Sequence, residues 1–222
     1  NTPPSSPSQG NPGGSTSGGG GGGAGGAGAS GGPGSPNGAG GAGSPIAIET
    51  NTAKTYAAGG SGGEYPTNEH GDFSTGDGGD SQFNAGGKNG GSGIVVVRYQ
   101  IASTGSAKAT GGAISFYGGK TIHTFTTSGS LVNTSQITDA EFVLVGGGGG
   151  GGYPQGGGGG AGGMVVHTGP FTIPGPATNA VVVGGGGSGL GQAAAPANPG
   201  TTTTLAFPGT PVTYSAYRGG GS

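Results

Sequence analysis

The chain has 222 residues, of which 65 are glycine and 16 are proline, while hydrophobic residues make up only 28%, and this composition excludes a large conventional core. Six basic against eight acidic residues, thinly spread, give no basic stripe for phosphate groups, so we expect no nucleic-acid partner. The sequence has no cysteine and no apolar run near the roughly 20 residues of a membrane span, so we expect neither disulfides nor membrane insertion.

The first half of the chain alternates low-complexity and strand-like segments. Residues 1–45 are rich in serine, proline, glycine and alanine, and residues 46–58 alternate apolar and polar side chains as a β-strand does. A polar, acidic, glycine-rich stretch follows at 59–93. The run 94–101, which begins Ile-Val-Val-Val, predicts a strand that closes this half.

The second half follows a connector of small residues at 102–113. Residues 114–117 and 120–126 flank Gly118-Gly119, which predicts a tight β-hairpin. Further strands are predicted at the apolar runs 141–145, 164–172, 180–183, 201–207 and 211–217. Two of these strands lead directly into long glycine runs.

Strands that lead into glycine runs favour an ordered bundle over flexible loops on a β scaffold, which is the alternative. Glycine can adopt the left-handed, three-residue-per-turn extended helix, which has no internal hydrogen bonds. Without Cβ atoms, such helices approach closely enough to hydrogen-bond sideways. We therefore expect a mainly β fold with a bundle of polyglycine (polyproline-II-type) helices, short antiparallel strands flanking the glycine runs, and essentially no α-helix.

No catalytic or cofactor-binding pattern emerges, and we expect the chain not to be an enzyme and to carry no cofactor. The sequence has no nucleophile motif of the Ser/His/Asp kind. Gly119-Lys120-Thr121 ends like a phosphate-binding loop, but the first glycine of that motif would fall at Ile114, so we interpret it as a hairpin edge. We predict no metal site, with calcium at Asp72, Asp77 and Asp80 left open because their spacing fits no standard calcium loop.

Four aromatic residues and one asparagine are the candidate surface sites. Tyr65, Phe73, Phe83 and Tyr153 lie between glycine runs, where they either contact a receptor or cap the ends of the bundle. Asn133 begins the sequon Asn-Thr-Ser and is a candidate glycosylation site.

The segments Phe125-Thr-Thr-Ser-Gly and Glu141-Phe-Val-Leu-Val, followed by the glycine runs at 146–152 and 156–163, resemble the glycine-rich domain of phage tail-fibre, adhesin and environmental surface fibre proteins. The resemblance implies that a short β segment opens the domain, a strand enters a glycine bundle, and a strand of the type Gly-Gly-Ser-Gly-Ile-Val-Val-Val-Arg-Tyr closes it. Residues 90–99 are that closing segment.

The closing segment precedes the opening one, so the domain is permuted. Residues 114–222 read as the N-terminal part of a glycine-rich repeat and residues 1–101 as its C-terminal part, so that 114–222 followed by 1–101 of a neighbour or of the next repeat makes one complete domain. Three explanations stay open: one repeat of a tandem array, donation of residues 1–101 between subunits, or two truncated domains.

We therefore expect a structural subunit or tandem repeat of an extracellular filament, which associates head to tail with copies of itself. The alternative is a phage tail-fibre or adhesin domain on a secreted fibre or virion, whose loops at 64–82 bind a host-surface glycan or outer-membrane protein. A third idea, an ice-binding face, has only the threonines at 201–204 in its favour.

Overall fold

The computed structural model describes residues 9–32, 37–63, 69–82, 86–102, 105, 107–154, 156–191, 196–208 and 212–222. Within these ranges the chain forms twelve β-strands and no helix. The expectation of a mainly β fold is therefore confirmed. No helix that could cross a membrane is found in the described part of the chain.

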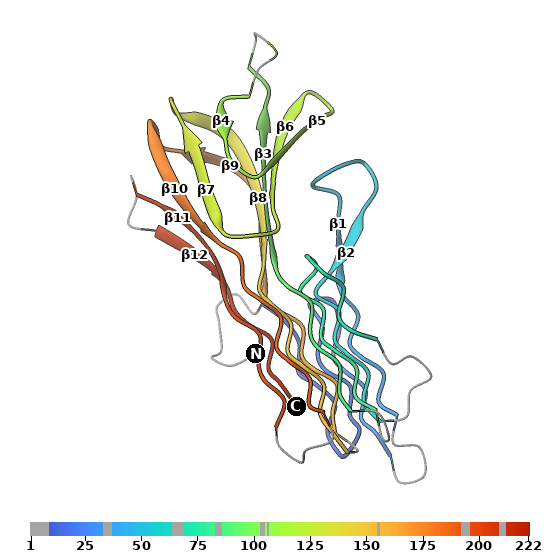
Figure 1. Cartoon of the computed structure of the whole chain (residues 1–222). Coiled ribbons are helices and arrows are strands. Elements are labelled where there is room, and N and C mark those ends of the chain that lie inside the picture. The colour runs from blue at the N-terminus through green and yellow to red at the C-terminus, as the bar shows by residue number, and fades with distance from the viewer. Residues whose placement is uncertain are drawn as a thin grey trace.

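The strands gather at one end of the molecule and the glycine runs at the other (Figure 1). The first sheet is fully antiparallel and holds, in spatial order, β5 (Ala113–Tyr117), β6 (Lys120–Phe125), β3 (Ile94–Gln100), β8 (Ile137–Val145) and β9 (Met164–Ile173). The second sheet holds β12 (Val212–Ala216), β11 (Thr203–Phe207), β10 (Ala177–Val182), β7 (Gly129–Asn133) and β4 (Ala109–Thr110). A two-stranded ribbon, β1 (Ser44–Ile46) and β2 (Lys54–Tyr56), stands beside the first sheet (Figure 1).

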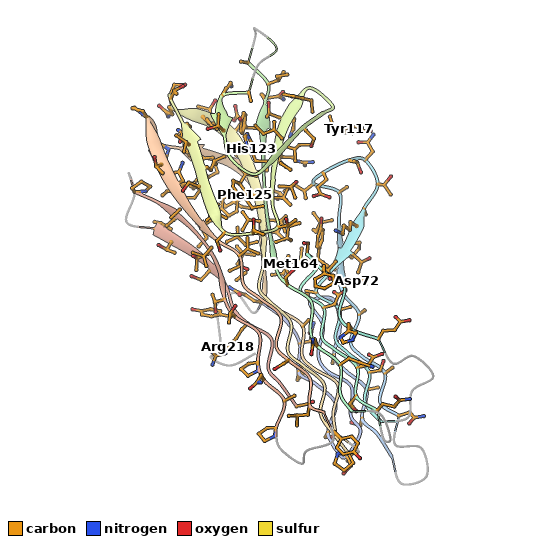
Figure 2. The ribbon with its side chains drawn as sticks, in the orientation of Figure 1. Asp72, Tyr117, His123, Phe125, Met164 and Arg218 are labelled. Carbon is orange, nitrogen blue, oxygen red and sulfur yellow. The ribbon has the colours of Figure 1, made fainter. Side chains whose placement is uncertain are left out.

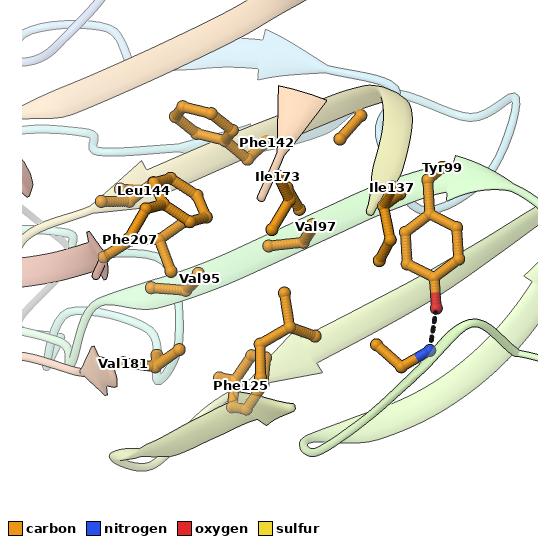
Figure 3. Packing of buried hydrophobic residues seen from close by; sticks show 14 of the residues in the cluster. Val95, Val97, Tyr99, Phe125, Ile137, Phe142, Leu144, Ile173, Val181 and Phe207 are labelled. Carbon is orange, nitrogen blue, oxygen red and sulfur yellow. Dashed lines mark hydrogen bonds between the residues drawn. The ribbon is translucent and has the colours of Figure 1, made fainter. Parts of the chain in front are cut away.

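The main hydrophobic core lies between the two five-stranded sheets (Figure 3). Val95, Val97 and Tyr99 of β3 meet Val181 and Phe207 of the second sheet in one buried cluster. On the opposite face of the first sheet, Ile94 and Val96 join a second cluster that contains residues of the ribbon. Strand β3 is thus buried on both faces, which explains its unbroken apolar run.

Strand β3 is also the central strand of its sheet, paired with β6 on one side and β8 on the other. The two segments that the permuted order separates are therefore packed together within one chain. The segment that resembles a closing strand fills the middle of a sheet whose other strands all follow it in sequence.

The amides of the glycine run 146–152 donate in turn to three neighbouring segments, and the pattern repeats every three residues. Every third amide, at Gly146, Gly149 and Gly152, donates to the segment 157–163, at Gly163, Gly160 and Gly157 in turn. Gly147 and Gly150 donate to Thr201 and Asn198 of a second segment. Gly148 and Gly151 donate to Gly91 and Lys88 of a third. A β-strand points its amides alternately to two sides, so a period of three marks a different backbone conformation.

The same run also accepts hydrogen bonds from three further segments. Gly79, Gly187 and Gly219 donate to the carbonyl oxygens of Gly149, Gly148 and Gly147. A run of seven glycines is therefore surrounded by six segments, with no side chain between them. These lateral bonds satisfy backbone groups that a glycine-rich chain would otherwise bury without partners.

The structure differs from the sequence-based expectations in three places. Residues 46–58 do not form one strand, because only residue 46 and residues 54–56 are in strands, β1 and β2, which pair as a ribbon. The connector at 102–113 contains β4 and the first residue of β5, and β7 occupies a mostly polar segment where no strand was predicted. Both β4 and β7 belong to the second sheet, and they form because β7 pairs with β10 and β4 pairs with β7. Tertiary pairing decides the conformation of such weakly patterned segments.

Candidate functional site

The four candidate aromatic residues differ in whether the structure describes them and in how exposed they are. Tyr65 and Phe83 lie outside the described residues. Phe73 is 86% exposed, the largest value among the exposed large hydrophobic residues described. Tyr153 is half-buried on the connection where the run 146–152 turns back, with Gly152 donating to Gly157. Of the two, only Phe73 presents its ring to solvent as a receptor contact requires.

The loop that carries Phe73 is held by hydrogen bonds on both sides. The hydroxyl of Thr75 donates to the carbonyl oxygen of Asp72 at 2.7 Å, and the amide of Ser74 donates to Oγ of Ser92 at 3.0 Å. Ser74 adopts a φ of 60°, a left-handed conformation that non-glycine residues seldom take. A residue in this region keeps its conformation only where its surroundings fix it.

The glycine run 146–152 and the six segments hydrogen-bonded to it form the glycine bundle. A groove of about 380 Å³ opens beside Phe73 on the flank of this bundle. Figure 2 marks Asp72, the residue before Phe73, on that flank below the ribbon. The groove is lined by His70, Gly71, Phe73, Asn89, Gly90, Ser92, Gly186 and Ser188. Sequence reasoning included His70 in the predicted loop at 64–82 but missed Asn89, Ser92 and Ser188, because nothing in the sequence indicates that positions near 70, 90 and 187 share one surface.

Two of the three aspartates considered for calcium are occupied by backbone amides. Oδ1 of Asp77 accepts from the amide of Ala58 at 2.8 Å, and the carboxylate of Asp80 accepts from the amides of Ser61 and Glu69 at 2.7 and 3.0 Å. Burial raises the pKa of Asp77 above its usual value, against the lowering effect of the bond from Ala58. In the described ranges, no group of three or more His, Cys, Asp or Glu residues stands close enough to hold a metal ion.

Asn133, the residue of the glycosylation sequon, is buried with 1% of its surface exposed. Its Nδ2 donates to the carbonyl oxygens of Ser135 and Pro174 at 2.7 and 2.9 Å, and its Oδ1 accepts from Asn179 at 2.8 Å. A glycan on Nδ2 would break these bonds, so Asn133 is a structural residue in this fold and not an accessible acceptor.

The hairpin at Gly118-Gly119 joins β5 to β6 as predicted. Both glycines have positive φ, 57° and 74°, which a two-residue turn of the type favoured in hairpins requires. Lys120 forms an ion pair with Glu141 across the sheet, so its ammonium group is part of a structural contact. This agrees with the interpretation of Gly119-Lys120-Thr121 as a hairpin edge.

Strand β5 is an open edge of the first sheet. All five of its residues are exposed, including Ile114, Phe116 and Tyr117 at 41%, 56% and 44%. Its unpaired side offers free backbone groups beside apolar side chains, which is a site for pairing with another strand. The other edge of the same sheet is β9, on the far side of β8.

Glu141 holds the closing segment to the rest of the sheet. Its carboxylate accepts from Nη2 of Arg98 at 2.6 Å and is also paired with Lys120. Partial burial alone would raise the pKa of Glu141, but the hydrogen bonds from Arg98 and Lys120 hold it below its usual value. Arg98 also donates to the carbonyl oxygens of Ala47 and Ile48 at 2.9 and 3.2 Å, which ties the ribbon to the sheet.

Tyr99 and His123 form a buried polar pair within the core. Nδ1 of His123 lies 2.7 Å from the carbonyl oxygen of Gly111, so Nδ1 carries the proton and Nε2 accepts from the hydroxyl of Tyr99 at 2.8 Å. The hydroxyl of Tyr99 accepts in turn from the amide of Ala109, the bond drawn in Figure 3. Burial lowers the pKa of His123, against the opposing effect of the Gly111 bond.

Comparison with known proteins finds a similarity in the C-terminal part of the chain. Residues 124–222, from the end of β6 to the last glycine run, match the family model described as a glycine-rich domain. Strand β3 and the groove residues up to 92 lie outside the matched part. No curated protein and no solved structure matches the chain. The C-terminal segment of this chain is thus similar to a glycine-rich domain.

Proposed function

We propose that the chain is a building block of an extracellular fibre, a rigid module whose glycine runs are polyglycine helices held by lateral backbone hydrogen bonds. The observation that carries the proposal is the three-residue period of the bonds from the run 146–152. The left-handed extended helix has three residues per turn and presents its amides in three directions. A module of this kind derives stiffness from backbone groups rather than from a side-chain core.

The absence of side chains inside the bundle is a second support. At each of five successive positions, 147 to 151, a Cβ atom would lie within 2.4 Å of a carbonyl oxygen of another segment. Real Cβ atoms do not approach oxygen so closely, so only glycine fits. The glycine content of the sequence therefore matches the packing, in which the segments around 147–151 lie too close together for side chains.

The first sheet supplies a route for copies to associate head to tail. Its two edges, β5 and β9, lie at opposite ends of the sheet, so β5 of one copy can pair with β9 of the next. Pro170 lacks an amide proton, and the amide of Met164 already donates to the carbonyl oxygen of Gln9, so the pairing uses the part of β9 between these two residues. Because the two edges differ, the contact is heterologous and links copies head to tail, and it propagates into a filament when the rotation between successive copies does not close a ring.

Substitution of one edge residue tests this association. Phe116→Lys places a charge on β5, where edge strands use charge to prevent pairing. Val182→Lys, at a residue that is 47% exposed on the inner strand β10, is the matched control. Sedimentation of the purified chains is expected to show large assemblies for the parent and for Val182→Lys, and single folded chains for Phe116→Lys. Equal assembly of both variants would contradict the use of β5.

The mass of the native material after boiling in detergent decides between separate subunits and a tandem array. A species the size of this chain means separate subunits, and a species several times larger means covalent repeats. The pairing of β3 with β6 and β8 of the same chain supports association of complete modules over donation of residues 1–101 between subunits.

The second candidate function, an adhesin domain that binds a host surface, is favoured by the exposed ring of Phe73 on its fixed loop. In that function the glycine bundle is a platform and the loop within 64–82 makes the contact. One fold can serve both functions. Substitutions in β5 or β9 would impair fibre assembly, whereas substitutions in the loop within 64–82 would impair binding to a host surface.

A further inference from the structure

The groove beside Phe73 has the features of a built binding site and is independent of the proposed association through β5 and β9. Its volume of about 380 Å³ falls within the roughly 300–1,000 Å³ of small-molecule sites. Phe73 stands at the groove with 86% of its surface exposed, on a loop fixed by the bonds of Ser74 and Thr75. Because the loop backbone is already ordered, binding to the exposed ring does not have to order the loop.

The polar side chains of the groove are oriented by their acceptor atoms, which leaves their donors for a ligand. Nδ1 of His70 accepts from the amide of Asn89 at 3.1 Å, so the proton of the neutral ring is on Nε2. Oδ1 of Asn89 accepts from the amide of Gly189 at 2.9 Å, which points its Nδ2 group elsewhere. Oγ of Ser92 accepts from Ser74, so its hydroxyl proton is also free to donate.

Oγ of Ser188 completes this set, because it accepts from Nδ2 of Asn198 at 2.7 Å. Each of these four side chains thus has an acceptor atom engaged in a hydrogen bond within the chain, while its polar hydrogens remain for a ligand. None of the described residues that line the groove carries a carboxylate, an ammonium or a guanidinium group. The site therefore fits an uncharged ligand that offers several acceptor oxygens.

Two backbone amides in the walls of the groove are not available for β-pairing with an extended peptide. The amide of Gly71 donates to the carbonyl oxygen of Asn89, and the amide of Gly90 donates to that of Gly187. These backbone groups are used inside the bundle, so a peptide strand finds no ladder to join. The ligand has to be recognised by its own hydroxyl oxygens and by an apolar face.

We propose that this groove binds a neutral saccharide, with one sugar ring stacked on Phe73 and its hydroxyl oxygens accepting hydrogen bonds from Asn89, His70 and the two serines. A sugar ring has an apolar face of C–H groups that fits the flat face of an aromatic ring. Its many hydroxyl oxygens match the donors that surround the ring. This inference gives the adhesin function a ligand class, and it stands or falls separately from fibre assembly.

Nuclear magnetic resonance of the ¹⁵N-labelled full chain tests the proposal with four neutral disaccharides: cellobiose, lactose, maltose and N,N′-diacetylchitobiose. At least one is expected to give saturable shifts of the Asn89 and Gly186 amides, with a Kd of about 0.1–10 mM, which is ordinary for a small ligand in an open groove. No saturable shift from any of the four at about 20 mM would overturn the proposal, because the Kd would then lie above the expected range.

Three variants locate the binding. Phe73→Ala is expected to weaken binding about tenfold or more while the spectrum stays that of a folded chain, because the ring is exposed. Phe73→Tyr keeps the ring and is expected to retain binding, and Phe116→Ala, at an exposed ring on β5, is expected to leave it unchanged. Unchanged binding in Phe73→Ala would overturn the assignment. Loss of self-association in Phe73→Ala, without an effect on saccharides, would instead make this surface a contact between copies and overturn it too.

Discussion

A Cβ atom on Gly149 would lie 2.0 Å from the carbonyl oxygen of Gly220, whereas a Cβ on Gly220 would meet no atom within 4 Å. The two glycines are neighbours in the bundle, yet only one of them tolerates a side chain. This asymmetry provides a matched pair of substitutions.

Gly149→Ala is expected to destabilise the chain by about 3 kcal/mol or more, because the methyl group forces apart two hydrogen-bonded segments. Gly220→Ala is expected to change stability by less than about 0.5 kcal/mol, as surface substitutions usually do. Chemical unfolding of both variants measures the difference. Equal stability of the two would mean that the bundle is not packed as described.

Hydrogen exchange is expected to protect the glycine runs as strongly as the central sheet. The amide of Gly148 donates to the carbonyl oxygen of Gly91 in the middle of six segments, so its exchange requires the bundle to open. The exposed turn glycine Gly118 is the internal reference for fast exchange. Exchange of Gly148 at the rate of Gly118 would show that the run is not held by lateral bonds.

The Tyr99–His123 pair predicts that the chain loses stability in mild acid. Burial lowers the pKa of His123 in the folded chain, so the unfolded chain binds more protons as the pH falls below about 6.5. The contribution of His123 is therefore complete above that pH and is lost as the pH falls toward the folded-state pKa. Urea unfolding at neutral and mildly acidic pH measures the loss.

The imidazole signals of His123 check the cause of this pH dependence. The folded chain is expected to show a midpoint for His123 below the ordinary value of about 6.5. A midpoint at or above that value would contradict the assignment, even if the chain were less stable in acid.

Glu141→Gln is expected to destabilise the chain by about 1–3 kcal/mol, because Arg98 and Lys120 lose the charge that pairs with both of them. Glu49→Gln is the control, since an amide oxygen can still accept the bond that Thr124 donates to Glu49. Thermal unfolding compares the two variants. A similar small effect in both would show that the ion pairs of Glu141 are not important for stability.

The sequence predicts the fold class and most strands, because the apolar runs at 94–101, 141–145 and 164–172 have the pattern of buried strands. It also indicates that residues 90–99 complete a domain opened later in the chain, and the structure packs those segments together. Strand β7 escaped prediction because its five residues, Gly-Ser-Leu-Val-Asn, gain strand structure only by pairing with β10.

The candidate sites were harder to predict. Asn133 matches a glycosylation sequon in sequence, but its burial depends on the contacts of β7 with Pro174 and Asn179. Phe73 was identified from its place between glycine runs and His70 lies in the same predicted loop at 64–82, whereas Asn89 and Ser188 were not identified. Their proximity arises from the lateral register of three glycine-rich segments, which no local pattern encodes.

Electron microscopy of the purified 222-residue chain, concentrated at neutral pH, tests the central claim most directly. The account predicts unbranched filaments that are one module wide, because pairing of β5 with β9 of the next copy is a head-to-tail contact that adds copies in one direction. Particles the size of a single chain at every concentration would contradict the claim that this module builds a fibre through its sheet edges.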